Sequence, residues 1–433
     1  MSKHLKVFKF GGASVKDAAS IKNVLDIVKR YENDQLVIVV SAMAKTTNHL
    51  EQVVSTYAEG GDAFAVLEEV KNFHYGIARE LFESPEELLV NLNDTLVEIE
   101  WLLEEPMEDS YDYVYDQIVS VGELLSTHIV AAYFNAHGKA TTWVDARDLI
   151  QTDNIYREGW VQWDETIKRT RQTLLPILES GNYVMTQGFI GATSENFTTT
   201  LGREGSDYSA AILSFCLDAE EMVIWKDVPG ILTGDPRRFD QVSKMDHISY
   251  REAIEMTYYG AQVIHPKTIK PLQNKHIPLL VKSFVDPEGS GTVISSDAED
   301  AYPPIVSVEE DQALIRISTK DFSFVAEHHM SFLFKHIADI RLQVNLMQNT
   351  AISFVICVND VDDKVEQFAK AVEDTFKVHF ERGLELFTIR HYNEDIINNL
   401  KAGKIILAEE RMPRTTQFVT KTIPAMTLKG HES

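Results

Sequence analysis

The chain has 433 residues, and its 66 acidic residues outnumber its 41 Lys and Arg residues, which gives a formal net charge of −25. This length suggests two or three domains, and the 44% of apolar residues excludes a disordered or fibrous chain. The negative charge argues against a nucleic-acid-binding protein, because phosphate backbones require a basic surface. No apolar run is long enough to span a membrane and the N-terminus has no signal-peptide pattern, so we expect a cytoplasmic protein.

Strand-like and helical segments alternate over the first 290 residues. Residues 35–41 form a continuous apolar run, which is typical of a strand buried on both faces of a parallel sheet. The alternation predicts one layered α/β domain with a mostly parallel sheet. Further strands are predicted at 5–10, 140–144, 183–189, 221–227 and 277–284, and helices at 14–30, through most of 49–138, and at 165–180, 206–217 and 265–276.

The composition changes near residue 286, where Pro, Gly, Ser and Asp become frequent. This change marks a linker, which we place at 291–312. Beyond it, strands and helices follow the order βαββαβ, which is the ferredoxin-like α+β pattern. We place this region, one full unit plus a partial second, at 313–423, and a frayed tail at 424–433. The full unit has strands at 313–319, 342–348, 352–358 and 384–392 and helices at 330–339 and 362–376; the partial unit has a helix at 394–402 and strands at 404–409 and 416–421.

A glycine-rich cluster follows the first predicted strand. The strand ends in Lys9, Gly11 and Gly12 come next, and Ser14 is suited to cap a helix. Glycines allow backbone N–H groups to approach an anion closely, and a helix N-terminus adds a favourable dipole. Lys9 would then supply a positive charge to a phosphate group. By itself the pattern also fits an ordinary strand-to-helix turn, and it is not a Walker A loop.

Polar residues also stand at two helical positions. At the start of the helix predicted at 206–217, plain capping accounts for Ser206 and Asp207. Capping does not account for Arg203, whose guanidinium group can bind a carboxylate. Glu123 lies among apolar neighbours in a helical stretch, and taken alone it is interpreted as an exposed helical residue.

A polar loop at 225–237 follows the strand predicted at 221–227 and contains Pro-Gly and Asp-Pro turns. Such loops at the carboxyl ends of parallel strands are where α/β sheets bind ligands. In their amino-acid sequences and in their order along the chain, this loop and the clusters above resemble the motifs of aspartate kinases in the amino-acid kinase family. The matching segments are KFGGASV (9–15), SAMAKTTNHL (41–50), VSVGELLST (119–127), QGFIGAT (187–193), LGREGSDYSAA (201–211), WKDVPGILTGDPR (225–237) and YYGAQVIHPKTI (258–269).

The resemblance implies a three-layer α/β/α amino-acid kinase (carbamate kinase-like) domain over residues 1–290 and an ACT-type regulatory region in the ferredoxin-like part. The family transfers the γ-phosphoryl group of ATP to the side-chain carboxylate of L-aspartate, which gives 4-phospho-L-aspartate and ADP on the way to lysine, threonine and methionine. Mg²⁺ would be carried on the ATP phosphates. Because a carboxylate is already ionised at pH 7, the reaction needs positioning and charge neutralisation rather than a general base.

The resemblance also assigns roles to individual residues. Lys9 and Asp207 are the catalytic pair, in which Lys9 neutralises the transferred phosphoryl group and Asp207 orients Lys9. Glu123 pairs with the substrate ammonium and Arg203 with its α-carboxylate. The other substrate contacts are Ser41, Thr47 and Ser206, and the nucleotide-binding residues are Gly11, Gly12, Ser14, Lys226, Asp227, Leu232, Arg237 and Gln262.

Three positions depart from the family pattern. The family often has Thr at position 226, where this chain has Lys226, and an aromatic residue where it has Leu232. Many members have a phosphate-contacting Lys at the position of Gln262. Because loss of that cation would weaken phosphoryl stabilisation, we hypothesise that Lys226 replaces it.

ACT regions pair across an interface and hold an amino acid there. The resemblance therefore implies a homodimer or higher homo-oligomer and an amino-acid effector, either lysine or threonine. The effector candidates are Asn345, Asn349 and Thr350. Members regulated by lysine often have Asp where Asn345 stands, so lysine sensitivity stays open. A purely structural dimerisation module is the alternative.

Two other interpretations of the whole chain remain. It could be another amino-acid kinase family enzyme, acting on glutamate or a nucleotide, or a non-catalytic amino-acid sensor. Glu123 and Arg203 favour a free amino acid as substrate, and the presence of Lys9, Arg203 and Asp207 argues against a sensor. Because no Gly-x-Gly-x-x-Gly follows a strand and the ACT region lies near the end of the sequence, we expect a monofunctional kinase without a homoserine dehydrogenase module.

Overall fold

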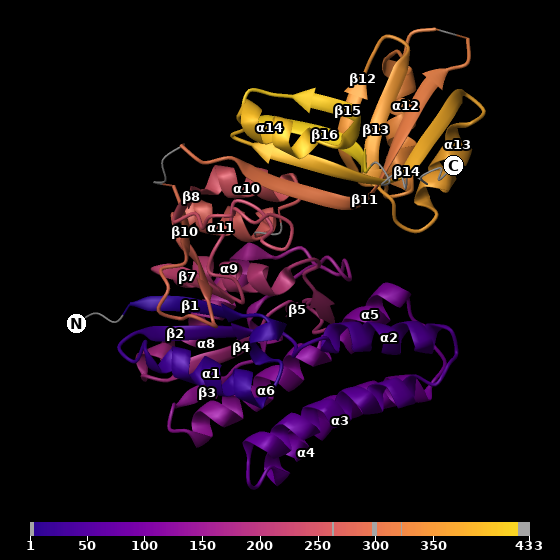
Figure 1. Ribbon diagram of the computed structural model, residues 1–433. Coiled ribbons are helices and arrows are strands. Elements are labelled where there is room, and N and C mark those ends of the chain that lie inside the picture. Colours follow the sequence, from indigo (N-terminus) through magenta and orange to yellow (C-terminus); the bar gives the residue numbers. More distant parts are fainter. Residues whose placement is uncertain (1–3, 262–263, 297–300, 322, 423–433) are drawn as a thin grey trace, which may run out of the picture. The chain divides into compact units, whose positions relative to one another are not determined.

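The computed structural model describes residues 4–261, 264–296, 301–321 and 323–422 (Figure 1). The chain folds into two compact units. Two short segments, 232–243 and 255–261, belong to the second unit although their neighbours in the sequence belong to the first. Within the described residues, no helix is both long enough and apolar enough to cross a membrane.

An eight-stranded sheet forms the centre of the first unit. Its neighbouring strands pair in parallel, except β9 and β10, which are antiparallel. The predicted mostly parallel sheet is therefore confirmed. In the order in which they lie side by side, the strands are β3 (Thr141–Trp143), β4 (Tyr183–Gln187), β2 (Gln35–Val40), β1 (Leu5–Phe10), β7 (Glu221–Lys226), β9 (Leu279–Ser283), β10 (Thr292–Ser295) and β8 (His247–Ser249).

Helices cover both faces of this sheet. Successive strand residues point to opposite faces, and Phe8 and Ile38 share one core with apolar residues of α1 and α6. Helix α9 packs on β1, β2 and β7, and α8 packs on β4 and α9. This arrangement is the expected three-layer α/β/α class. The helices are α1 (Ala18–Lys29), α2 (Thr46–Ala58), α3 (Ala63–Leu81), α4 (Glu86–Glu104), α5 (Tyr111–Val119), α6 (Val121–Ala136), α7 (Ala146–Leu149), α8 (Trp163–Glu179), α9 (Gly205–Leu217), α10 (Tyr250–Tyr258) and α11 (Pro266–Lys275).

The first unit differs from the sequence prediction at several places, and α7, β8 and α10 were not predicted. The helix predicted from Ser14 begins instead at Ala18, because the Asp17 side chain accepts a hydrogen bond from the Ser20 N–H at 2.7 Å and caps it there. A 3₁₀ turn, η1 (Gly12–Val15), precedes it. A hairpin of two three-residue strands, β5 (Ile190–Ala192) and β6 (Thr198–Thr200), was not predicted from the sequence.

The second unit is built on a six-stranded antiparallel sheet. Four of its strands lie in the order β12-β13-β11-β14, which with the βαββαβ succession is the ferredoxin-like arrangement. The predicted fold class is therefore confirmed for this region as well. Its elements are β11 (Ile305–Thr319), α12 (Glu327–Asp339), β12 (Val344–Asn349), β13 (Ser353–Asn359), α13 (Lys364–Val372), β14 (Phe376–Arg390), α14 (Glu394–Lys401), β15 (Lys404–Arg411) and β16 (Thr415–Thr422).

Strands β11 and β14 are longer than the sequence suggested and form one antiparallel ribbon. The register shifts on both sides of Gln312, and Asp311 and Gly383 have positive φ angles near these shifts. A bulge bends a ribbon without ending it, so β14 begins at Phe376 rather than at residue 384, and the helix predicted at 362–376 ends at Val372. The segment predicted as a linker, 291–312, contains β10 and the first half of β11. The domain boundaries themselves stay predictions.

Candidate active site

A buried ion pair lies where β1 meets the start of α9. Lys9 Nζ is 2.7 Å from Asp207 Oδ1, and the two side chains are only 12% and 6% exposed. Lys9 comes one residue before the end of β1, and Asp207 lies in the first turn of α9, which packs on β1. Placing two charges in such surroundings costs desolvation free energy that a stabilising apolar contact would not. The pair therefore fits a functional role for the lysine better than a stabilising one.

Glycines bring the loop after β1 against the loop after β2. A Cβ atom on Gly12 would lie 2.6 Å from the Ala42 carbonyl oxygen, and one on Gly11 would lie 3.4 Å from Lys9 Nζ. The Ala44 N–H donates to the Gly12 carbonyl at 3.1 Å. Ser14 is buried, and its hydroxyl donates to the Trp225 carbonyl at 3.4 Å. The glycines thus allow the loop after β1 to pack backbone against backbone on the loop after β2, and the Ser14 side chain ties the turn to β7.

Glu123 lies in the first turn of α6 and is 3% exposed. Its Oε1 accepts a hydrogen bond from the Ala42 N–H at 3.3 Å, while its buried Oε2 has no hydrogen-bond partner among the described residues. Burial raises the pKa of this carboxyl group to about 8, against the opposing effects of the Ala42 N–H and of the Lys9 charge. The expectation of an exposed helical residue, drawn from Glu123 alone, is wrong. A buried carboxylate oxygen without a donor is suited to a cationic ligand group.

The segment before α9 presents Arg203 to solvent. Its side chain is exposed and makes no hydrogen bond or ion pair with any residue that the structure describes. The next residue, Glu204, has a positive φ of 54° and accepts a hydrogen bond from the His265 N–H at 2.9 Å. Ser206 follows in the first turn of α9, and a Cβ on Gly188 would lie 2.5 Å from the Ser206 Cβ. The backbone on both sides of Arg203 is held while its guanidinium group is available.

The comparisons with known proteins agree with this geometry. Residues 4–283 match the family model described as the amino acid kinase family. The chain belongs to the amino acid kinase family. This kinase is 32% identical over 360 residues to lysine-sensitive aspartokinase 3 of Escherichia coli, a match that covers 82% of this chain and 78% of the relative. The resemblance to aspartate kinases inferred from the motifs is confirmed.

Longer relatives and solved structures show the same likeness. The bifunctional aspartokinase/homoserine dehydrogenase 1 of Arabidopsis thaliana is 28% identical over 86% of this kinase, but the match spans 42% of that relative's length. E. coli aspartokinase III has been solved with lysine and aspartate, and with aspartate and ADP. Both structures have a TM-score of 0.81 to this kinase, with 28% and 27% identity; they cover 96% of this chain, which covers 95% and 96% of theirs.

The remaining predicted residues of the first unit lie around these groups. Ser41 follows β2, and its carbonyl oxygen accepts a hydrogen bond from Ser126 of α6 at 2.7 Å. Thr47 is the second residue of α2 and is half-buried. Lys226 ends β7, and its carbonyl oxygen accepts from the Phe284 N–H at 2.8 Å. Asp227 is the exposed residue that follows.

Two predicted nucleotide contacts lie outside the first unit. Leu232 and Arg237 belong to the second unit. The Arg237 guanidinium is bonded to Asp235 of its own loop, with Nη2 2.8 Å from Oδ2, and this pairing raises the pKa of Arg237. Gln262 lies outside the described residues.

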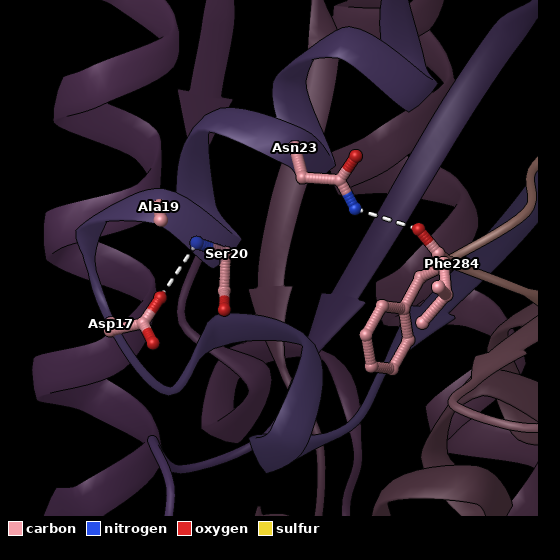
Figure 2. Close-up of a pocket in the computed structure, with 6 residues that line it drawn as sticks. Asp17, Ala19, Ser20, Asn23 and Phe284 are labelled. Carbon is pink, nitrogen blue, oxygen red and sulfur yellow. Dashed lines mark hydrogen bonds between the residues drawn. The ribbon is translucent and has the colours of Figure 1, made fainter.

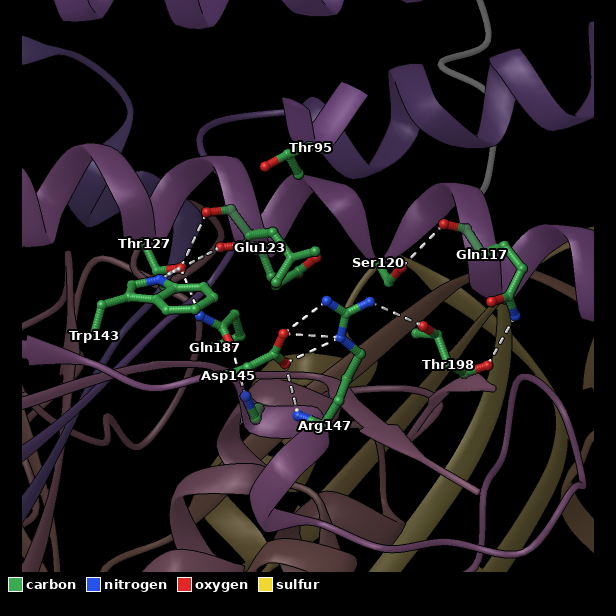
Figure 3. Close-up of polar contacts among 12 residues, drawn as sticks. Thr95, Gln117, Ser120, Glu123, Thr127, Trp143, Asp145, Arg147, Gln187 and Thr198 are labelled. Atoms are coloured by element: carbon green, nitrogen blue, oxygen red, sulfur yellow. Dashed lines mark hydrogen bonds and ion pairs between the residues drawn. The ribbon is translucent and has the colours of Figure 1, made fainter. Parts of the chain in front are cut away.

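Behind Glu123 lies a buried polar layer that sequence reasoning missed (Figure 3). Thr127 Oγ1 lies 2.9 Å from the Glu123 carbonyl, and it accepts hydrogen bonds from Trp143 Nε1 at 2.9 Å and Gln187 Nε2 at 2.8 Å. Gln187 Oε1 in turn accepts from the Ala146 N–H at 2.7 Å. These bonds fasten α6, one turn after Glu123, to the ends of β3 and β4. Thr127 lies in a mostly apolar helix and Gln187 ends a buried strand, and this position of polar residues in buried elements is the signal that could have found them.

The predicted effector residues lie on β12 and the turn after it. Asn345 Nδ2 donates to Gln312 Oε1 at 2.9 Å and to Asn359 Oδ1 at 2.5 Å, so its amide is already engaged with side chains of β11 and β13. Asn349 and Thr350 are exposed, and the Thr350 hydroxyl lies 2.7 Å from the Ser353 hydroxyl. The three residues therefore do not share one set of contacts.

A shallow hollow of about 360 Å³ lies beside the N-terminus of α1 (Figure 2). Asn23 Nδ2 donates to the Phe284 carbonyl at 2.7 Å across its floor. None of the predicted site residues that the structure describes lines it. Over the same described residues, no three His, Cys, Asp or Glu side chains form a group that could hold a metal ion.

Proposed function

We propose that this kinase transfers the γ-phosphoryl group of ATP to the side-chain carboxylate of L-aspartate, which gives 4-phospho-L-aspartate and ADP. A carboxylate oxygen attacks the γ-phosphorus, the bond from that phosphorus to the β,γ-bridging oxygen breaks, and ADP leaves. The attacking carboxylate is ionised at pH 7, so no proton has to be removed. Catalysis then depends on alignment and on neutralising charge.

The chemistry of the site residues supports this assignment of roles. Lys9 neutralises charge on the transferred phosphoryl group, and Asp207 holds the Lys9 ammonium in place through the 2.7 Å ion pair. The glycine-containing backbone after β1 binds the nucleotide, together with Lys226 at the end of β7 and Asp227 after it. When Mg²⁺ is bound on the ATP phosphates, it neutralises the charge that develops between them.

The single observation that carries the proposal is the state of Glu123. Its Oε2 is buried without a partner among the described residues, and burial raises its pKa to about 8. An ammonium group offers the missing donors and the compensating charge, and Arg203 offers a guanidinium group to a carboxylate. Together they fit the α-ammonium and α-carboxylate of a free amino acid, and a nucleotide acceptor has no ammonium group for Glu123.

A hydroxylamine trap tests the reaction. Hydroxylamine converts an acyl phosphate into a coloured hydroxamate, so the purified protein is incubated with ATP and Mg²⁺ and with aspartate, glutamate or no acceptor. We expect signal with aspartate alone. Folded protein that binds ATP and gives no hydroxamate with either acid would refute an acyl-phosphate product.

We also propose that the second unit regulates the kinase by binding an amino acid, lysine or threonine, and pairs with a second copy of the chain. The E. coli aspartokinase III structure contains lysine. In this kinase, Asn345 would have to exchange its bonds to Gln312 and Asn359 to reach an effector. Activity that stays flat when lysine and threonine are each titrated would support a purely structural module instead.

A further inference from the structure

A second buried carboxylate, Asp116 of α5, holds two segments that are distant in the sequence. The side chain is fully buried. Its Oδ2 accepts hydrogen bonds from the Thr200 N–H and from the Arg157 N–H, both at 2.9 Å, and its Oδ1 accepts from the Thr200 hydroxyl at 2.7 Å. Burial still raises the pKa of Asp116 to about 6 against these three bonds. Such a group is costly to bury, so its contacts call for an explanation beyond stability.

The segment that Asp116 holds leads directly to Arg203. We call residues 198–205 the Arg203 segment. At its start, Gln117 Nε2 donates to the Thr198 carbonyl at 2.9 Å and Arg147 reaches the Thr198 hydroxyl at 3.3 Å (Figure 3). Two residues later, Asp116 binds both the backbone and the side chain of Thr200. Asp116 and Gln117, which are neighbours on α5, therefore hold β6, whose residues lie three to five positions before Arg203 in the sequence.

The Arg157 contact supports the same segment from a second direction. The Gly159 N–H donates to the Thr200 carbonyl at 2.9 Å. A Cβ on Gly202 would lie 3.2 Å from the Arg157 carbonyl oxygen, so the loop held by Asp116 packs against the residue before Arg203. Beyond Arg203, the Glu204 carboxylate binds the His265 N–H. The residues before and after Arg203 are thus held, although its own side chain is exposed and makes no bond to a described residue.

The helix that carries Asp116 also leads into the helix that carries Glu123. Helix α5 ends at Val119 and α6 begins at Val121, so the two carboxyl groups are seven positions apart in the sequence. Glu123 is the group that the proposed function assigns to the substrate ammonium, and Arg203 is the group assigned to its α-carboxylate. A rigid connection between α5 and the Arg203 segment would hold these two groups at one separation.

We propose that Asp116 is a positioning residue for the acceptor amino acid, because it fixes the Arg203 segment relative to Glu123. The inference rests on the proposed function, since it takes Arg203 and Glu123 as the groups that hold the substrate. It assigns Asp116 no contact with substrate. Its effect is on how well the acceptor binds, and the nucleotide is bound by other residues.

Steady-state kinetics of three variants test this role. In Asp116→Ala, the Thr200 and Arg157 N–H groups lose their acceptor, and we expect the KM for aspartate to rise at least about tenfold while the KM for ATP stays within about twofold. Asp116→Asn can keep its oxygen on both N–H groups while the Thr200 hydroxyl turns to accept, so it should restore aspartate binding to within about threefold of wild type. Thr200→Val removes one bond and should show a smaller change in the same direction.

Tyr115→Phe is the matched control. Tyr115 is the neighbour of Asp116 on α5, and its hydroxyl binds Glu51 at 2.7 Å, whereas its ring, which Phe keeps, has its centroid 4.3 Å from Arg157 Cζ. This variant should keep both KM values. If Asp116→Ala and Thr200→Val leave the KM for aspartate unchanged, or raise the KM for ATP to the same extent, the positioning role is refuted.

Limited proteolysis separates this inference from the proposed function. Trypsin cleaves after Arg203 and Arg157, which are both exposed. We expect cleavage after these residues to be at least about fivefold faster in Asp116→Ala than in wild type, and unchanged in Tyr115→Phe. Faster cleavage in a chain whose wild type makes no aspartyl hydroxamate would overturn the proposed function and leave Asp116 as the residue that fixes the segment. Cleavage at the wild-type rate would overturn the positioning role itself.

Discussion

Glu123→Gln should stabilise the free protein and weaken aspartate binding, because the wild-type carboxyl group is buried without a full set of partners. Its pKa is raised to about 8 from an ordinary value of 4.5. A carboxyl group whose pKa is higher in the folded state destabilises that state as soon as the unfolded chain ionises, so the stability it costs grows between pH 4.5 and pH 8. At about 1.4 kcal/mol per pH unit, the cost is roughly 3 kcal/mol at pH 7 and about 1 kcal/mol at pH 5.

The amide of Glu123→Gln does not titrate, so the variant escapes this pH dependence. Urea unfolding of wild type and of Glu123→Gln at pH 5 and pH 7 measures the pH dependence of the free energy of unfolding that Glu123 causes. The contributions of all other carboxyl groups cancel in the comparison. Relative to wild type, the variant should gain roughly 2 to 3 kcal/mol between pH 5 and pH 7. Because this is a difference between two pH values, it is independent of any constant penalty for the buried amide.

The same substitution should weaken the binding of the acceptor, aspartate. A charge-assisted hydrogen bond contributes about 1.5 to 3 kcal/mol, so the KM for aspartate should rise roughly 10- to 100-fold, with a smaller change in the KM for ATP. Glu104→Gln, an exposed position on α4, is the control and should change neither stability nor KM. Identical pH dependence of unfolding in Glu123→Gln and wild type would refute the argument from burial. An unchanged KM for aspartate would refute the ammonium role.

Four further substitutions follow from the site. Lys9→Met should lower kcat at least about 100-fold and destabilise the protein by about 3 kcal/mol because Asp207 is left buried and unpaired; adding Asp207→Asn should restore the melting temperature without restoring kcat. Lys226→Ala should change the KM for ATP or kcat more than about twofold if Lys226 replaces the missing cation. Thr127→Val should raise the KM for aspartate, whereas Thr127→Ser keeps the hydroxyl and should not, as steady-state kinetics will show. Gly12→Ala should lower the melting temperature and destabilise the fold by about 1 to 3 kcal/mol, because a backbone carbonyl stands 2.6 Å from the new Cβ.

Each of these has an outcome that would contradict it. Recovery of kcat in the Lys9 and Asp207 double variant would mean that Lys9 acts only structurally. If the KM for ATP and kcat of Lys226→Ala both stay within twofold of wild type, Lys226 does not replace the lysine that the family has at position 262. Equal kinetics for the two Thr127 variants would show that its hydroxyl does not position Glu123, and a wild-type melting temperature for Gly12→Ala would show that the two loops can move apart.

The strand, glycine turn and lysine at the end of β1 could be predicted because their signals are local. A run such as residues 35–41 indicates a buried strand, and a Lys followed by glycines at a strand end indicates an anion site. The same local signals placed Arg203 and Asp207 at the start of α9. They also gave the alternation from which the parallel sheet and the ferredoxin-like order were inferred.

Glu123 and Asp116 could not be understood in this way. Glu123 was interpreted as exposed, yet α6 is apolar on nearly all sides, which is the pattern of a buried helix and was the available signal. Asp116 finds its partners 41 and 84 residues away, on a loop and on a three-residue strand without a sequence signature. The β11–β14 ribbon likewise continues through a bulge near Gln312 that no local sequence pattern predicted.

Hydrophobic periodicity and turn preferences depend only on residues that are close together in the sequence. The sequence by itself therefore determined most helices and strands, the class of fold and the candidate site residues. Burial and pairing depend on which distant segments meet. Only the tertiary structure therefore decided that Lys9 is paired with Asp207, that Glu123 lies out of water with one oxygen lacking a partner among the described residues, and that Asp116 holds the Arg203 segment.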